Sequence, residues 1–212
     1  MSLLATEYSM AADDNSFTTG YAKQQQVWNG FVDKLYRLHK KTLDEHDYYT
    51  IERIGGYGGR TNNLEYYREV HYHDRKTSQL LSIVKWALAY PFGIHMIDVF
   101  AYDKEGRLKR EYSATYLPSR HTSPSETLIT LHYYKGNLHS FREFDASNIH
   151  LYEQCSNIED DSVIFAFHYE DIPDSLSELE KDKQEAYRAC FSHTANTAAP
   201  YTDPLVEISA QD

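Results

Sequence analysis

The stretch from His95 to Tyr116 (HMIDVFAYDKEGRLKREYSATY) constrains the fold most, because its side chains alternate in character at every second residue. A period of two is the signature of a β-strand, in which successive side chains point to opposite faces. The segment Asp103–Gly106 between the alternating halves is typical of a tight turn, in which glycine takes a positive φ at no steric cost. The second half is wholly polar on one face, which predicts a sheet with one solvated side. Its other face carries Leu108, Arg110, Tyr112, Ala114 and Tyr116.

The same alternation continues on both sides of this hairpin, from Tyr48 to Tyr169. The predicted strands are joined mostly by tight turns, so the pattern indicates an antiparallel meander of eight or nine strands. We expect this meander to close into a barrel, because closure removes exposed strand edges; the alternative is an open, strongly curved sheet wrapped around a helix. The predicted strands are 48–57, 64–74, 80–88, 95–102, 108–117, 127–134, 138–145, 149–155 and 163–169, of which 80–88 also fits a short helix.

Two helices are predicted to flank the strands. The first covers 21–43, where large apolar side chains recur every three to five residues. The second follows Pro173, and Ser175 with Glu178 has the spacing of a capping box. The fold class is therefore mainly β, of the α+β type, with one helix on each side of the meander. We therefore predict three parts of the chain: a disordered segment over 1–19, a single domain over 20–192 and a flexible tail over 193–212.

The formal net charge of −11, from 21 basic and 32 acidic residues, argues against a nucleic-acid partner, which requires clustered lysine and arginine. The charge suits a partner protein that presents a basic surface. No apolar run is long enough to span a membrane, and the first residues lack the pattern of a secretory signal. Cys155 and Cys190 form no CxxC pair and indicate no disulfide framework. We therefore expect a cytoplasmic protein.

Charged residues interrupt the apolar faces of five predicted strands. If these faces point into the fold, three arginines and two carboxylates lie inside it. Buried charges are costly unless they are paired or contact a ligand, and three cations against two anions leave a place for an acidic group. Two alternatives stay open: one or two faces are assigned to the wrong side, or the charges form structural ion pairs. The charged residues are Arg68, Arg110, Arg142, Asp98 and Glu153.

His71 and His73 share one face of a strand, a spacing at which two imidazoles can bind one metal ion. The sequence does not identify a third ligand, although His132 and His168 are candidates. No hydrolase motif occurs, and the glycine-rich stretch 55–59 lacks the ending of a phosphate-binding loop. The residues therefore assign no catalytic group and no cofactor, and they leave open whether the chain is an enzyme.

A helix followed by a strand meander resembles the calycin class of ligand-binding barrels. The stretch 66–72 (YYREVHY) is similar to the Tyr-Arg-x-x-Val-Tyr strand of the T-type phycobiliprotein lyases. Those proteins hold a bilin whose propionates pair with interior arginines. By analogy of fold, the resemblance implies a chromophore-binding barrel.

Two functions are compatible with these features. The first is a small-molecule-binding barrel that acts as a carrier, chaperone or chromophore-attachment factor for an apolar ligand with acid groups. Arginines would clamp the acid groups and carboxylates would orient them, in a cavity of about 300–1,000 Å³. The second is a non-enzymatic interaction protein, such as an immunity or assembly factor, whose acidic, tyrosine-rich surface meets a basic partner. The ligand contacts predicted for the first function are Arg68, Asp98, Arg110, Arg142, Glu153, Tyr66, Tyr72 and Tyr112.

Overall fold

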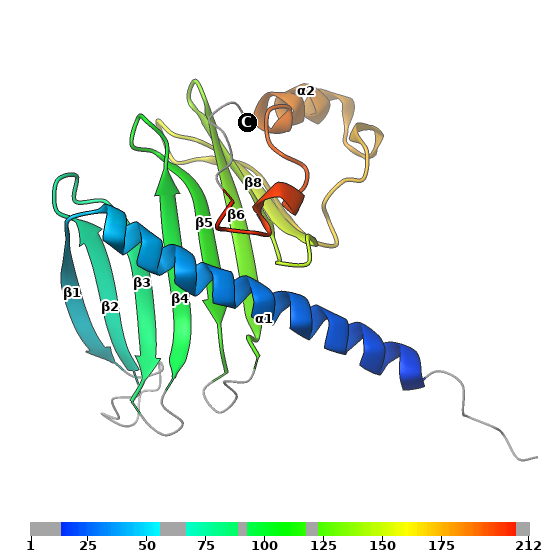
Figure 1. The fold of residues 1–212 in the computed structure, drawn as a ribbon. Coiled ribbons are helices and arrows are strands. Elements are labelled where there is room, and N and C mark those ends of the chain that lie inside the picture. The colour runs from blue at the N-terminus through cyan, green and yellow to red at the C-terminus, as the bar shows by residue number, and fades with distance from the viewer. Residues whose placement is uncertain (1–13, 56–66, 89–92, 118–122, 207–212) are drawn as a thin grey trace, which may run out of the picture.

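The computed structural model describes residues 14–55, 67–88, 93–117 and 123–206 (Figure 1). Its centre is one sheet of nine strands, which lie side by side in the order in which they occur in the sequence. Every pair of neighbouring strands is antiparallel, so the predicted meander is confirmed and 80–88 contributes a strand. The strands are β1 (Tyr48–Gly55), β2 (Tyr67–Asp74), β3 (Leu80–Ala87), β4 (Ile94–Tyr102), β5 (Leu108–Thr115), β6 (Glu126–Lys135), β7 (Leu138–Phe144), β8 (His150–Asn157) and β9 (Val163–His168).

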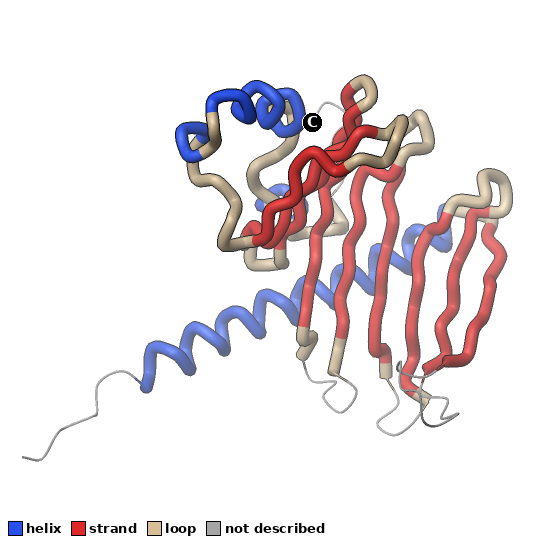
Figure 2. The backbone as a smooth tube through the Cα atoms, turned by 180° about the vertical axis from the view of Figure 1, so that it is seen from behind, coloured by secondary structure: helices blue, strands red, loops and turns tan. Residues whose placement is uncertain are grey.

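The sheet is open. β1 and β9 are its two edges and do not pair with each other within the described ranges. The strands at the two ends of the sheet run in visibly different directions, which is the twist expected of a large antiparallel sheet (Figure 2). A closed barrel is therefore not formed by the described residues, and the arrangement is nearer to the predicted alternative of an open sheet.

The helix α1 (Asp14–Glu45) crosses one face of the sheet and begins earlier than the predicted 21–43 (Figure 1). Its apolar stripe packs against alternate residues of the central strands, so helix and sheet bury a common layer. Each large apolar side chain buried there contributes roughly 1.5–3 kcal/mol. No helix in the described parts of the chain is long and apolar enough to cross a membrane. The shared layer includes Phe31, Val32, Leu35, Val84, Ile97, Val99, Ile129 and Leu131.

After β9 the chain forms the short helix η1 (Leu176–Glu178) and then α2 (Lys181–Phe191). A disulfide joins Cys155 on β8 to Cys190 on α2, so the prediction of no disulfide framework is wrong. A pair of cysteines 35 residues apart carries no local signal, because their proximity depends on where α2 docks. The predicted capping box is also displaced: Ser175 precedes η1, and its side chain makes no capping hydrogen bond.

Residues 193–206, which we name the C-terminal segment, pack on the fold and do not form the predicted flexible tail. The segment includes η2 (Ala199–Tyr201), whose Tyr201 is buried. The side-chain oxygen of Asn148 accepts a hydrogen bond of 2.6 Å from the backbone N–H of Ala198. Lys34 Nζ on α1 lies 2.6 Å from Asp203 Oδ2. Ala198, one of the small residues that suggested a tail, is fully buried in this packing.

Candidate functional site

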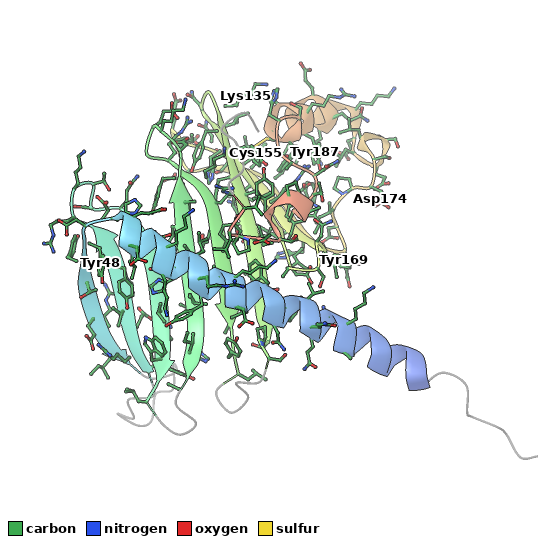
Figure 3. The ribbon with its side chains drawn as sticks, viewed as in Figure 1. Tyr48, Lys135, Cys155, Tyr169, Asp174 and Tyr187 are labelled. Carbon is green, nitrogen blue, oxygen red and sulfur yellow. A yellow bond between two sulfur atoms is a disulfide. The ribbon has the colours of Figure 1, made fainter. Side chains whose placement is uncertain are left out.

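Two of the predicted interior charges form a closed ion pair. Arg142 on β7 lies opposite Glu153 on β8, and its Nε is 2.8 Å from the carboxylate Oε2. Glu153 also accepts a hydrogen bond of 2.6 Å from the hydroxyl of Tyr187, which Figure 3 shows close to the disulfide-bonded Cys155. Burial and the Glu153 carboxylate raise the pKa of Tyr187 to about 12. Both charges are therefore compensated within the protein, and neither is left over for an acidic ligand.

Arg68 on β2 lies toward the opposite edge of the sheet and has its own partner. Its guanidinium makes a bidentate contact with Glu52 on β1, with 3.0 Å between Nη2 and Oε2. The hydrogen bond with Arg68 lowers the pKa of the Glu52 carboxyl. Tyr72, also on β2, packs on His39 with ring centres 5.0 Å apart. Tyr66 lies outside the described residues. The predicted set of arginines therefore does not converge on one cavity.

Asp98 lies on the face of the sheet that α1 does not cover. We name this the uncovered face, and Figure 2 views the sheet from behind α1. It alternates along β4 with Ile97 and Val99, which belong to the core beneath α1. Ser113 Oγ on the uncovered face donates a hydrogen bond of 2.6 Å to Asp98. The expectation that Asp98 shares an interior with the arginines does not hold. Both faces of β4 are rich in apolar residues, so its sequence does not fix which face is buried.

The two central hairpins separate at one end of the sheet. β4 and β5 stay paired as far as Leu108, and β6 and β7 stay paired as far as Lys135. The ladder between β5 and β6 already ends at the pair Arg110–Leu131. Beyond that pair the ends of β5 and β6 belong to different hairpins, and a fork opens between them.

A cleft of about 480 Å³ lies at this fork, and we name it the fork cleft. Its volume falls within the range of small-molecule sites, roughly 300–1,000 Å³. The walls carry four cationic side chains and two carboxylates, and both carboxylates contact the same cation, Arg107. The cleft therefore has a net positive charge in a protein that is acidic as a whole. Its lining residues are Tyr102, Asp103, Lys104, Glu105, Arg107, Lys109, Arg110, His132, Tyr133 and Tyr134.

Two buried nitrogen atoms of cleft-lining residues make no hydrogen bond to any described residue: Nε of Arg110 and Nε2 of His132. Such an atom costs about 1–3 kcal/mol when it stays unsatisfied, so a ligand oxygen that reached it would be stabilised. The other ring nitrogen of His132, Nδ1, lies 3.0 Å from Nε2 of His139. Burial, together with His139, lowers the pKa of His132 to about 4. The imidazole is therefore neutral near pH 7 and can either donate or accept.

Arg110 connects the fork cleft to the interior. Its guanidinium carbon lies 5.7 Å from the ring centre of Tyr201 in the C-terminal segment. Tyr112, two residues further along β5, is buried with its ring centre 6.3 Å from that of Phe31. Among the predicted ligand contacts that the structure describes, Arg110 is the residue that lines the cleft.

A row of carboxyl groups crosses the uncovered face. Glu111 and Glu143 lie on either side of Thr130 in the register, and Asp98 is on the strand next to Glu111. Burial, followed by the charges of Asp98 and Glu143, raises the pKa of Glu111 to about 7. Burial and the neighbouring Glu126 raise the pKa of Glu143. Half-buried carboxylates that repel one another are costly, and a cationic group placed on this face would compensate them.

His71 and His73, the predicted metal ligands, lie on the uncovered face with ring centres 6.2 Å apart. Nε2 of His71 is 2.6 Å from Oε1 of Glu69, which gives this ring a partner of its own. His132 and His168 stand on β6 and β9, several strands away. In the ranges that the structure describes, no group of three or more His, Cys, Asp or Glu side chains is placed to hold a metal ion.

Comparisons with protein-family models, with curated proteins and with solved structures found no match for this chain. The described residues form an open antiparallel sheet of nine strands, with one long helix across a single face. Sequence reasoning missed Lys104, Arg107 and Lys109 as cleft residues, because they occupy a turn and a polar strand face. The clustering of basic residues in 104–110 (KEGRLKR) was the signal that could have revealed them.

Proposed function

We propose that this protein binds a small apolar molecule that bears an acid group, and that the acid group enters the fork cleft. The observation that carries the proposal is the coincidence of net positive charge with the unsatisfied Nε of Arg110 in one cleft. An acid oxygen that reached Nε of Arg110 would complete the hydrogen bonding of that nitrogen, whereas His132, which follows the Leu131 partner of Arg110, points to the other face of the sheet. Charge-assisted bonds of this kind are roughly twice as strong as neutral ones.

The tyrosines of the cleft wall supply contacts for the apolar part of the ligand. The ring of Tyr134 lies between His139, at 4.7 Å between ring centres, and the guanidinium of Arg107, at 4.9 Å. A wall held in this way loses little conformational entropy when a ligand binds. Such a site suits a carrier, a chaperone or a chromophore-attachment factor, each of which must first bind its ligand.

Native mass spectrometry of protein purified gently from its own host, with an absorption spectrum, tests this function. The wild-type protein should retain a small-molecule mass, and Arg110→Ala should lose it. Arg68→Ala is the matched control, because it removes an arginine of the same sheet that is engaged by Glu52 and lies outside the cleft. Bare protein in every preparation, or a mass retained by Arg110→Ala, would overturn the proposal.

A second candidate, the interaction protein, is favoured by the row of repelling carboxyls on the uncovered face. A lysine or arginine side chain of a partner protein would compensate Glu111 and Glu143 where no cluster suited to a metal ion exists among the described residues. A partner recovered with the wild-type protein should be lost from a Glu111→Gln, Glu143→Gln variant and kept by Glu170→Gln, which removes an exposed charge elsewhere. Equal recovery by all three proteins would remove this candidate.

A further inference from the structure

The C-terminal segment supports the fork cleft from the interior. Tyr133, which lines the cleft, accepts a hydrogen bond of 2.8 Å at its hydroxyl from the backbone N–H of Ala195. Arg110, which also lines the cleft, has its guanidinium over the ring of Tyr201 at 5.7 Å. Tyr133 on β6 and Arg110 on β5 therefore both contact the C-terminal segment, which is distant from them in the sequence.

Tyr201 is itself firmly placed. It is 7% exposed and ends η2, where its backbone N–H donates to the carbonyl of Ala198 at 2.7 Å. Asn148 in the turn between β7 and β8 accepts from the N–H of Ala198 at 2.6 Å. Lys34 on α1 holds Asp203 at 2.6 Å. The segment that carries the ring is therefore held by contacts with both the sheet and α1.

We propose that Tyr201 is a positioning residue for ligand binding, because its ring holds the Arg110 guanidinium at the inner end of the fork cleft. The proposal rests on the proposed function. An arginine side chain has many rotamers, and a ligand that must order it loses affinity. With Tyr201 in place, the guanidinium is ordered before the ligand arrives.

The contact with Tyr201 also decides which part of Arg110 meets the ligand. An aromatic ring attracts a cation over its face. The N–H donors of a guanidinium lie in its plane and point outward from its edge, so a ring over one face does not cover them. The Tyr112 hydroxyl takes part of this edge, and Nε stays without a partner among the described residues. That edge matches the two oxygens of a carboxylate. The ligand class that fits best is therefore an apolar carboxylic acid.

The test compares two probes that share an apolar chain, dodecanoate with its carboxylate and dodecanol with a neutral hydroxyl, by isothermal titration calorimetry at neutral pH. The wild-type protein should bind dodecanoate more tightly than dodecanol. Tyr201→Met should weaken dodecanoate binding by roughly threefold to tenfold, the range expected for loss of a cation–π contact, and leave dodecanol binding unchanged. Tyr201→Phe keeps the ring face and should bind dodecanoate as the wild type does.

The outcomes separate this inference from the function on which it rests. Wild-type protein without a preference for dodecanoate would overturn both. A preference that Arg110→Met abolishes and Tyr201→Met leaves intact would overturn the role of Tyr201 alone, as would equal weakening of both probes in Tyr201→Met. Circular dichroism melts show whether each variant is folded. Should Tyr201→Met not fold, Tyr201→Leu takes its place with the same expected result.

Discussion

Arg142 and Glu153 face each other across β7 and β8 as a buried ion pair, with 2.8 Å between Nε and Oε2 and with side chains that are 9% and 0% exposed. The alternation of the two strands predicts that both charges point inward, and the structure shows that each is the partner of the other. This pairing gives Arg142 a partner of opposite charge within the protein. It leaves Arg110, with an unsatisfied Nε, as the arginine available to an acid.

Arg142→Ala should reduce the free energy of unfolding by roughly 3–5 kcal/mol, because it leaves the buried Glu153 carboxylate without its cation. Urea denaturation followed by circular dichroism measures this loss. The double variant Arg142→Met, Glu153→Leu should recover most of it, since an apolar pair of similar volume leaves no buried charge. A loss below about 1 kcal/mol in Arg142→Ala would contradict the assignment of this pair as structural.

Loss of the Cys155–Cys190 disulfide should lower the stability by about 4 kcal/mol, as expected for a cross-link that closes a loop of 35 residues. Dithiothreitol should therefore lower the melting temperature of the wild-type protein. A Cys155→Ala, Cys190→Ala variant should melt at that lower temperature whether or not reductant is present.

The disulfide is also relevant to the cellular compartment of the protein, because disulfides persist in oxidising compartments and are rare in the cytosol. It weighs against the cytoplasmic location that we expected. Alkylation and mass spectrometry of host-purified protein should find both cysteines oxidised. Two free thiols in freshly isolated protein would contradict the disulfide.

Glu111 should make the protein less stable as the pH rises from about 5 to about 7. Its pKa in the folded state, about 7, is above the ordinary value of 4.5, so the folded protein holds a proton that the unfolded chain has lost in this window. The shift corresponds to at most roughly 3 kcal/mol, and solvent screening of this half-buried group reduces the effect to about 1–2 kcal/mol. Thermal melts across this range should show a smaller decline for Glu111→Gln than for the wild type. Glu170→Gln, at an exposed site, should behave as the wild type, and a parallel decline in all three proteins would refute the prediction.

Two glycine-to-alanine changes should have opposite signs. Gly106 has a φ of +80° in the turn before β5, and an added Cβ would lie 3.2 Å from Nε2 of Gln79, so Gly106→Ala should cost about 1–2 kcal/mol. Gly30 lies on an exposed part of α1 with open space around it, so Gly30→Ala should add about 0.5–1 kcal/mol. Chemical denaturation of both variants gives the two signs in one experiment. A stabilised Gly106→Ala would show that the turn does not need a positive φ.

The strands could be predicted closely from the sequence because period-two alternation is a local property. Whether the sheet closes could not, since closure depends on strand tilt and stagger, which alternation does not encode. The sequence also did not indicate which face of β4 is buried, because Ile97 and Val99 make one face apolar and Met96 and Phe100 make the other face apolar as well.

The candidate site was predictable in part. Arg110 was identified because a charge interrupts an otherwise apolar strand face. The cleft itself depends on the early end of the ladder between β5 and β6, which no residue type signals. The contribution of Tyr201 depends on the docking of η2, which a stretch of small and polar residues made look like a tail.

The central claim is that an acid group binds at Arg110, and NMR correlation of arginine Nε–H groups during titration with dodecanoate tests it most directly. The Arg110 signal should shift as its unsatisfied Nε gains an acceptor, while the Arg142 signal, already engaged by Glu153, should stay in place. Arg110→Ala identifies the signal by its loss. An unchanged Arg110 signal at saturating dodecanoate would contradict the account.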